Sequence, residues 1–164
     1  MKLSIVAMFV LLFGDLLGIA HATQTSTNIT VRVSVNSAPC KINNGQIIDV
    51  DFGSNIVTTD VAKGTVEKTI NYTLDCANAD TQKLLKMRIT GTGASFNSDV
   101  LKTSINELGV KIKADGTDYP VNTNLNLATI NSKPQLTALL VQQAGVRLPT
   151  GQFTAGATMT VDYQ

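Results

Sequence analysis

Apolar and polar residues alternate with a period of two along much of the 164-residue chain. This is the period of a β-strand with one buried and one exposed face, because successive side chains of a strand point to opposite sides. The longest such stretch, residues 66–76, ends at Cys76. The pattern predicts strands over residues 29–35, 48–52, 66–76, 85–89, 108–112 and 119–127, and residues 139–141 form a further apolar patch.

Short segments rich in glycine and asparagine separate the predicted strands and are typical of turns. They lie at residues 43–45, 52–54, 63–64, 115–116 and 144–145. No stretch between them has the pattern of a convincing long helix, and we find no internal repeat and no linker. The pattern therefore predicts an all-β chain that forms one antiparallel sandwich.

The first 22 residues have the pattern of a secretory signal peptide. Lys2 precedes an apolar run over residues 3–19, and Ala20 and Ala22 provide the small residues that a signal peptidase recognises. We therefore expect cleavage after Ala22 and export of the remaining chain. A membrane anchor is the alternative, but the run contains Asp15 and is shorter than the roughly 20 residues of a spanning helix.

The chain carries 13 basic and 12 acidic residues, so its charge balance does not indicate a nucleic-acid partner. Its core must be aliphatic, since it has no tryptophan and only 5% aromatic residues. The one histidine, His21, lies in the predicted signal peptide. Its loss would remove Ser–His and Cys–His catalysis and every histidine-ligated metal site. We therefore expect no enzyme activity, metal, cofactor or small-molecule substrate.

Cys40 and Cys76 are the only cysteines, and both follow the predicted signal peptide. An even pair in an exported protein is most simply a disulfide, because export passes through an oxidising compartment. The pair lacks the Cys-x-x-Cys spacing that lowers the pKa of a redox thiol. We therefore expect a structural Cys40–Cys76 bridge.

Asp49 and Asp51 lie on one side of the predicted strand over 48–52, about 7 Å apart, a separation that also suits a pair of glycosidase carboxylates. They alternate with apolar residues, which places them on the solvent-exposed face. No obvious neighbour there would raise the pKa of one carboxyl to make it a general acid. An ordinary polar strand face is therefore the better interpretation.

The last 14 residues, 151–164, resemble the C-terminal β-zipper motif of chaperone–usher pilins. Glycine stands fourteenth from the end, small or apolar residues alternate after it, and tyrosine is penultimate. Residues 38–46, with Pro39 before Cys40, and the segments 50–53 and 68–70 are similar to the adaptor subunits at the tip of P pili. The positions of the C-terminal motif are Gly151, Phe153, Ala155, Ala157, Met159, Val161 and Tyr163.

This resemblance implies an immunoglobulin-like sandwich that lacks its final strand. A periplasmic chaperone would lend a strand first, and the N-terminal extension of a neighbouring pilin subunit would replace it at the outer-membrane usher. The implied organisation is a signal peptide over 1–22, a donor-strand extension over 23–35 and a pilin domain over 36–164. The donor side chains would be Ile29, Val31, Val33 and Val35.

One feature of the extension differs from the family pattern: Val33 stands where many family members have glycine. The segment 29–35 could also be an ordinary strand of its own domain, which is the usual meaning of such alternation. The polar residues before it and the C-terminal motif favour the donor strand.

The sequence therefore predicts a structural minor pilin or adaptor that is exported through the periplasm to a cell-surface fimbria. A fimbrial adhesin that binds host carbohydrate is the alternative. The lack of tryptophan weakens it, because aromatic rings commonly stack on sugars, and so does a length that suits one domain. A secreted hydrolase is a third class, for which no catalytic site can be assembled.

Overall fold

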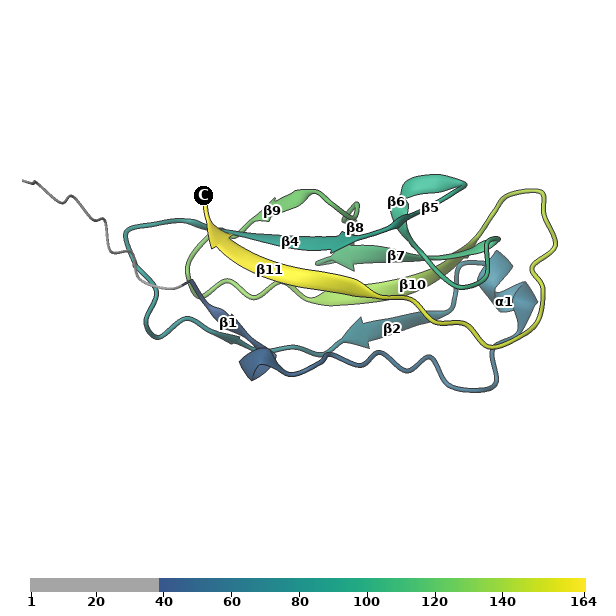
Figure 1. The fold of residues 1–164 in the computed structure, drawn as a ribbon, viewed down its shortest axis with the longest axis horizontal. Helices are drawn as coiled ribbons and strands as arrows, with labels where there is room; N and C mark the ends of the chain where they lie inside the picture. Colours follow the sequence, from purple (N-terminus) through teal and green to yellow (C-terminus); the bar gives the residue numbers. More distant parts are fainter. Residues whose placement is uncertain (1–38) are drawn as a thin grey trace, which may run out of the picture. The chain divides into compact units, whose positions relative to one another are not determined.

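The computed structural model describes residues 39–164, which form short strands joined by turns and coil (Figure 1). The predicted signal peptide and donor strand lie outside these residues. In chain order the elements are β1 (Lys41–Ile42), η1 (Asn43–Gly45), α1 (Thr58–Ala62), β2 (Glu67–Ile70), β3 (Leu74–Asp75), β4 (Leu85–Gly91), β5 (Gly93–Ala94), β6 (Asn97–Lys102), β7 (Leu108–Ala114), β8 (Thr117–Asp118), β9 (Asn124–Asn126), β10 (Leu136–Gln142) and β11 (Ala157–Tyr163).

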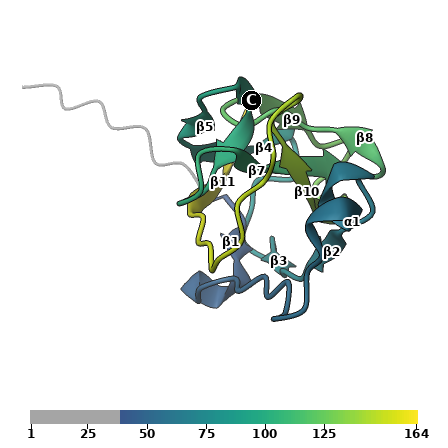
Figure 2. The same cartoon turned by 90° about the vertical axis from the view of Figure 1, so that its right-hand side faces the viewer.

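The strands form two larger antiparallel sheets and one small pair. The first sheet has the order β2-β10-β7-β6-β5, with β8 added to β7, and the second has the order β11-β4-β9. β1 and β3 form the pair. Figure 2 shows the strands end-on, with β1, β2 and β3 on the side opposite β9. The predicted antiparallel sandwich is confirmed.

The core lies between the sheets and is built from alternate residues of their central strands. In β4 the buried side chains are Leu85, Met87 and Ile89, which is the predicted parity. In β7 they include Leu108, Val110 and Ile112, again as predicted, and β10 adds four more. The period of two therefore identified the inward faces of β4 and β7 correctly. β10 does not alternate, because the adjacent Leu139 and Leu140 are both buried.

Several predicted boundaries were wrong. The stretch 66–76 is not one strand, because β2 pairs with β10 whereas β3 pairs with β1, and the chain changes partners between them. The predicted strand over 119–127 is reduced to β9. The pattern also missed β6 and the five-residue helix α1. Within residues 39–164, no helix is both long and apolar enough to cross a membrane.

The prediction of a strand over 48–52 was also wrong. The alternation itself is present, since Ile48, Val50 and Phe52 are half-buried while Asp49 and Asp51 are exposed. The segment is nevertheless coil, because no strand among the described residues forms a ladder with it. The pattern thus predicted the faces of this segment but not its lack of a hydrogen-bonding neighbour.

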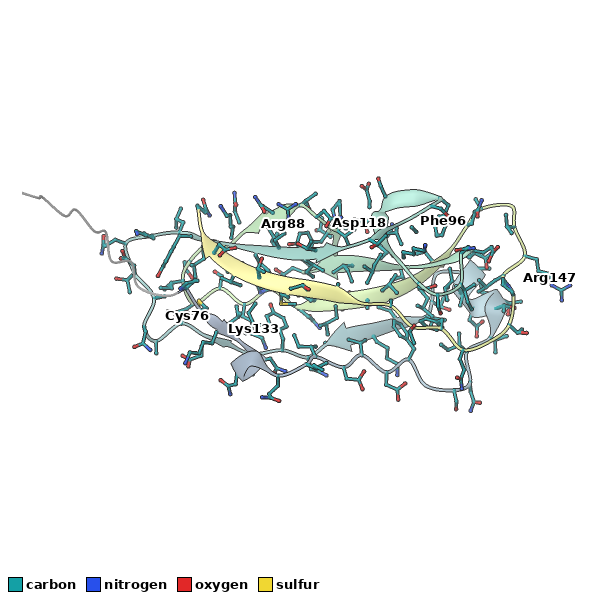
Figure 3. The ribbon with its side chains drawn as sticks, in the orientation of Figure 1. Cys76, Arg88, Phe96, Asp118, Lys133 and Arg147 are labelled. Atoms are coloured by element: carbon teal, nitrogen blue, oxygen red, sulfur yellow. A yellow bond between two sulfur atoms is a disulfide. The ribbon has the colours of Figure 1, made fainter. Side chains whose placement is uncertain are left out.

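The predicted disulfide between Cys40 and Cys76 is present. The bridge flanks the β1–β3 pair, in which Lys41 lies opposite Asp75. Figure 3 shows Cys76 toward the end of the domain that carries the C-terminus, with Arg147 at the opposite end. The bridge therefore fixes the chain at the start of β1, which precedes η1 and the coil that contains residues 48–52.

Candidate functional site

Strand β11 lies at the edge of its sheet. One of its edges pairs with β4, from Ala157 opposite Gly91 to Tyr163 opposite Leu85. Within residues 39–164, no strand pairs with the other edge. An unpaired edge presents a row of backbone N–H and C=O groups that can accept a further strand.

The coil over residues 46–57 follows η1 and leads to α1 (Figure 1). Its residues 46–54 and 56 line one side of an open groove, and β11 and the segment before it line another. The groove has a volume of about 1540 Å³. Four half-buried residues of the coil wall pack against the core, namely Ile48, Val50, Phe52 and Ile56. Ile47 is exposed, and so are Asp49 and Asp51, whose carboxylates lie at the rim. The groove is therefore bounded by two extended segments, and among the described residues no strand forms a ladder with either of them on that side.

Core side chains from both sheets form the floor of the groove. They come from five strands and are aliphatic throughout, so an occupant would meet no polar side chain there. These residues are Ile70 of β2, Ile89 of β4, Leu101 of β6, Leu108, Val110 and Ile112 of β7, and Ala138 and Leu140 of β10. The floor can therefore accept apolar side chains but offers no group for catalysis.

The structure places most of the predicted C-terminal motif along this groove. Met159, Val161 and Tyr163 lie opposite the buried residues of β4, so they share the core side of the sheet. Ala155 and Ala157 are exposed although they line the groove. Small, exposed side chains on a groove wall leave room for the side chains of an occupant.

The segment before β11 is held in place by contacts with the rest of the domain. The Ser104 amide donates to the Thr154 carbonyl at 2.9 Å, and the Thr154 amide donates to the Ser104 hydroxyl at 3.0 Å. The Phe153 ring lies 6.0 Å from the Phe52 ring, centroid to centroid, so the two walls meet here. Gly151 has a φ of 148°, which favours glycine over any other residue.

Tyr163 fixes the end of β11 to the turn before β4. Its hydroxyl accepts a hydrogen bond from the Asp80 amide at 2.8 Å, and the Lys83 ammonium lies 5.0 Å from the centre of its ring. The next residue, Gln164, donates through its side-chain amide to the Leu85 carbonyl at 2.9 Å. The penultimate tyrosine therefore also has a structural role within its own domain.

Sequence reasoning found one wall of the groove and missed the other. Cys40 and Cys76 are not among the lining residues, and the predicted donor residues lie outside the described part of the chain. The missed wall includes Gln46, Ile47 and Phe52. The alternation over 48–52 was its sequence signal, but that signal indicated a paired strand.

Comparison with known proteins identifies the family to which these features belong. The family model described as Fimbrial protein matches residues 27–164. The chain belongs to this family. The fimbrial-like protein YfcR of Escherichia coli strain K12 is 35% identical over 88% of this chain and 85% of its own length. The fimbrial adapter PapF of Escherichia coli is 29% identical over 93% of this chain and 96% of its own length.

Two solved structures resemble this fimbrial protein. The P pilus adaptor subunit PapF has a TM-score of 0.55 and 29% identity, over 80% of this chain and all of that one. The P pilus rod subunit PapA has a TM-score of 0.61, and at 19% identity it supports the fold alone. The domain is an incomplete immunoglobulin-like sandwich with open sheets, and the chain is a structural fimbrial subunit.

Proposed function

We propose that this subunit is a minor, adaptor-type pilin that joins its neighbours by donor-strand exchange. The observation that carries this proposal is the apolar groove beside the unpaired edge of β11. A strand in this groove would hydrogen-bond to the edge and bury side chains on the floor. In this role the subunit performs no chemistry and is exported through the periplasm to the cell-surface fimbria.

The N-terminal extension over residues 23–35 is the proposed donor strand that connects this subunit to a neighbouring one. It would become free after removal of a signal peptide over 1–22. Ile29, Val31, Val33 and Val35 would enter the groove of a neighbouring subunit. Four such side chains, at every second residue, span about 20 Å along one face of a strand. The β11 side of the groove has the same length from residue 153 to 159, if measured as extended chain. Their burial would contribute roughly 6–12 kcal/mol before the cost of ordering.

The proposed order of partners follows from the open groove and the unpaired edge of β11. A periplasmic chaperone would fill the groove first, because an open apolar groove beside an unpaired edge invites aggregation. The outer-membrane usher would then be the place where a neighbouring subunit replaces it. The resemblance of the C-terminal motif to that of chaperone–usher pilins supports β11 as the chaperone contact. We find nothing in residues 39–164 that favours carbohydrate binding.

The test compares two substitutions on opposite faces of the proposed donor strand. Val31→Asp should leave capture by the chaperone intact, because this side chain belongs in a neighbour's groove. Its incorporation into fibres should fall at least tenfold, since a carboxylate would have to be desolvated or protonated there. Arg32→Gln, on the opposite face and without a new negative charge, is the control, and both variants are assayed by chaperone co-purification and by detection in sheared fibres.

Equal loss of chaperone-bound protein and of fibre incorporation for Val31→Asp would contradict the proposal. That result would mean that residues 29–35 form a core strand of their own domain. Normal incorporation of Val31→Asp would contradict it as well, because the side chain would then not enter an apolar groove.

A further inference from the structure

The rim of the groove carries charge of one sign only. Asp49 and Asp51 are the only charged residues among those that line it, and no lysine or arginine of the described chain is among them. Both side chains are exposed. The facing wall contributes Thr154, Gly156 and Thr158. The mouth of the groove is therefore anionic on the coil side and neutral on the β11 side.

The two carboxylates have no ion-pair partner within residues 39–164, where the four salt bridges all involve other residues. Asp51 is held in place, because its Oδ1 accepts a hydrogen bond from the Gly53 amide at 2.7 Å. Their alternation with half-buried apolar residues fixes both side chains on the outer side of the wall. These charges are thus positioned beside the groove and are not neutralised within the described domain.

A strand that fills the groove would present its outward side chains next to these aspartates. Adjacent strands lie about 4.8 Å apart, and directly opposed residues have Cβ atoms about 5 Å apart. A lysine or arginine at the outward position between two groove-facing residues would reach Asp49 or Asp51, whereas an acidic residue there would be repelled. Opposite charges across a strand pair attract, and like charges destabilise the pair.

We propose that Asp49 and Asp51 select the occupant of this groove, and that this occupant is a donor strand with a basic residue at its outward position. The proposal rests on the donor-strand function proposed above and adds the chemistry of the partner. Residues 27–36 of this chain provide a suitable probe, because Arg32 is flanked by Val31 and Val33. The attraction between the basic residue and the two aspartates should mainly increase the rate of strand entry, since complementary charges speed association.

The experiment uses the full mature subunit purified with its periplasmic chaperone. Synthetic peptides of residues 27–36, with Arg32, Arg32→Lys or Arg32→Glu, are added at low salt, and their entry is followed by native mass spectrometry. We expect the Glu peptide to enter about tenfold more slowly than the other two, because an exposed attraction becomes a repulsion. The difference should disappear in 1 M NaCl, where the screening length is about 3 Å.

The subunit variants provide the complementary test. The double variant Asp49→Lys with Asp51→Lys should reverse the order of the Arg and Glu peptides, and the double Asn variant should remove the preference. Asp99→Lys is the matched control, because Asp99 is exposed on β6 and does not line the groove. It changes the charge by two units, half the change of the double Lys variant, outside the groove lining and should keep the wild-type order.

The possible results distinguish this proposal from the one on which it rests. If the Arg and Glu peptides enter the wild-type groove at equal rates at low salt, the selection by charge is wrong while donor-strand exchange stands. If no peptide enters, both proposals are wrong. If Asp99→Lys alters the order as strongly as the double Lys variant, net charge is responsible and the two aspartates have no specific role.

Discussion

The residue with the clearest double role is the penultimate Tyr163. Its place in the C-terminal motif suggested a contact with the chaperone. The structure shows that its hydroxyl also holds the Asp80 amide, while its ring packs under the Lys83 ammonium. A loss of chaperone binding on truncation of Tyr163 would therefore have two possible causes. One variant that removes only the hydroxyl and another that removes the whole ring can separate them.

We predict that Tyr163→Phe keeps capture by the chaperone while the amide hydrogen of Asp80 exchanges faster. The phenylalanine ring preserves the packing but removes the hydrogen bond, which costs about 1 kcal/mol. Tyr163→Ala should impair both properties, because it also leaves a gap beside β11. Hydrogen exchange and chaperone co-purification are the measurements. Loss of capture in Tyr163→Phe would instead mean that the hydroxyl itself contacts the chaperone.

At the scale of elements, the behaviour of a segment depends on its neighbour as much as on its own pattern. Residues 48–52 and β7 both alternate with a period of two, yet only β7 is a strand, with partners on both sides. Backbone groups without a partner give no ladder, whatever side chains surround them. The coil wall of the groove thus has the sequence pattern of a strand but no strand paired with it within residues 39–164.

We predict that filling the groove with a donor peptide protects amides of residues 48–52 and β11 from hydrogen exchange, by about tenfold or more. The new strand would pair with both walls, and paired amides exchange only when they open. The amides of β7 serve as the internal control, because both edges of that strand are already paired. Unchanged exchange over 48–52 with the peptide bound would show that the peptide pairs with β11 alone.

At the scale of the whole molecule, an aliphatic core contains two buried tyrosines that are tied to the backbone. The Tyr72 hydroxyl donates to the Pro134 carbonyl at 2.7 Å, and the Tyr119 hydroxyl donates to the Met87 carbonyl at 2.9 Å. Burial, helped by the charge of Asp115, raises the pKa of Tyr72 to about 12 from its usual 10. Burial also raises the pKa of Tyr119.

A pKa that is higher in the folded than in the unfolded state contributes stability below the unfolded value, and this contribution is lost as pH rises through the folded value. For Tyr72 the window is pH 10 to 12. We predict that the free energy of unfolding falls there by roughly 2–3 kcal/mol on its account. Urea denaturation of the peptide-filled subunit at pH 8 and 11.5 measures this fall.

The control for this prediction is Tyr72→Phe. It should be less stable at pH 8 by about 1–3 kcal/mol, because the Pro134 carbonyl loses its buried partner. Its further loss at high pH should be smaller than that of the wild type, since Tyr119 still titrates in both proteins. Identical alkaline losses in the two proteins would rule out Tyr72 as the group responsible.

The sequence alone determined the local features of the described domain. The period of two identified the buried faces of β4 and β7, and the cysteine pair predicted the disulfide, because each depends only on residue types along the chain. These features follow from side-chain direction and chemistry, which a strand sequence carries by itself.

Only the tertiary structure decided which strands pair and which edge stays open. Residues 66–76 read as one strand but divide between two sheets, and residues 48–52 read as a strand but line a groove. The sequence could not predict that Asp49 and Asp51 lie at the rim of this groove either. Pairing depends on backbone hydrogen bonds to segments distant in sequence, and alternation within one segment contains no information about its partner.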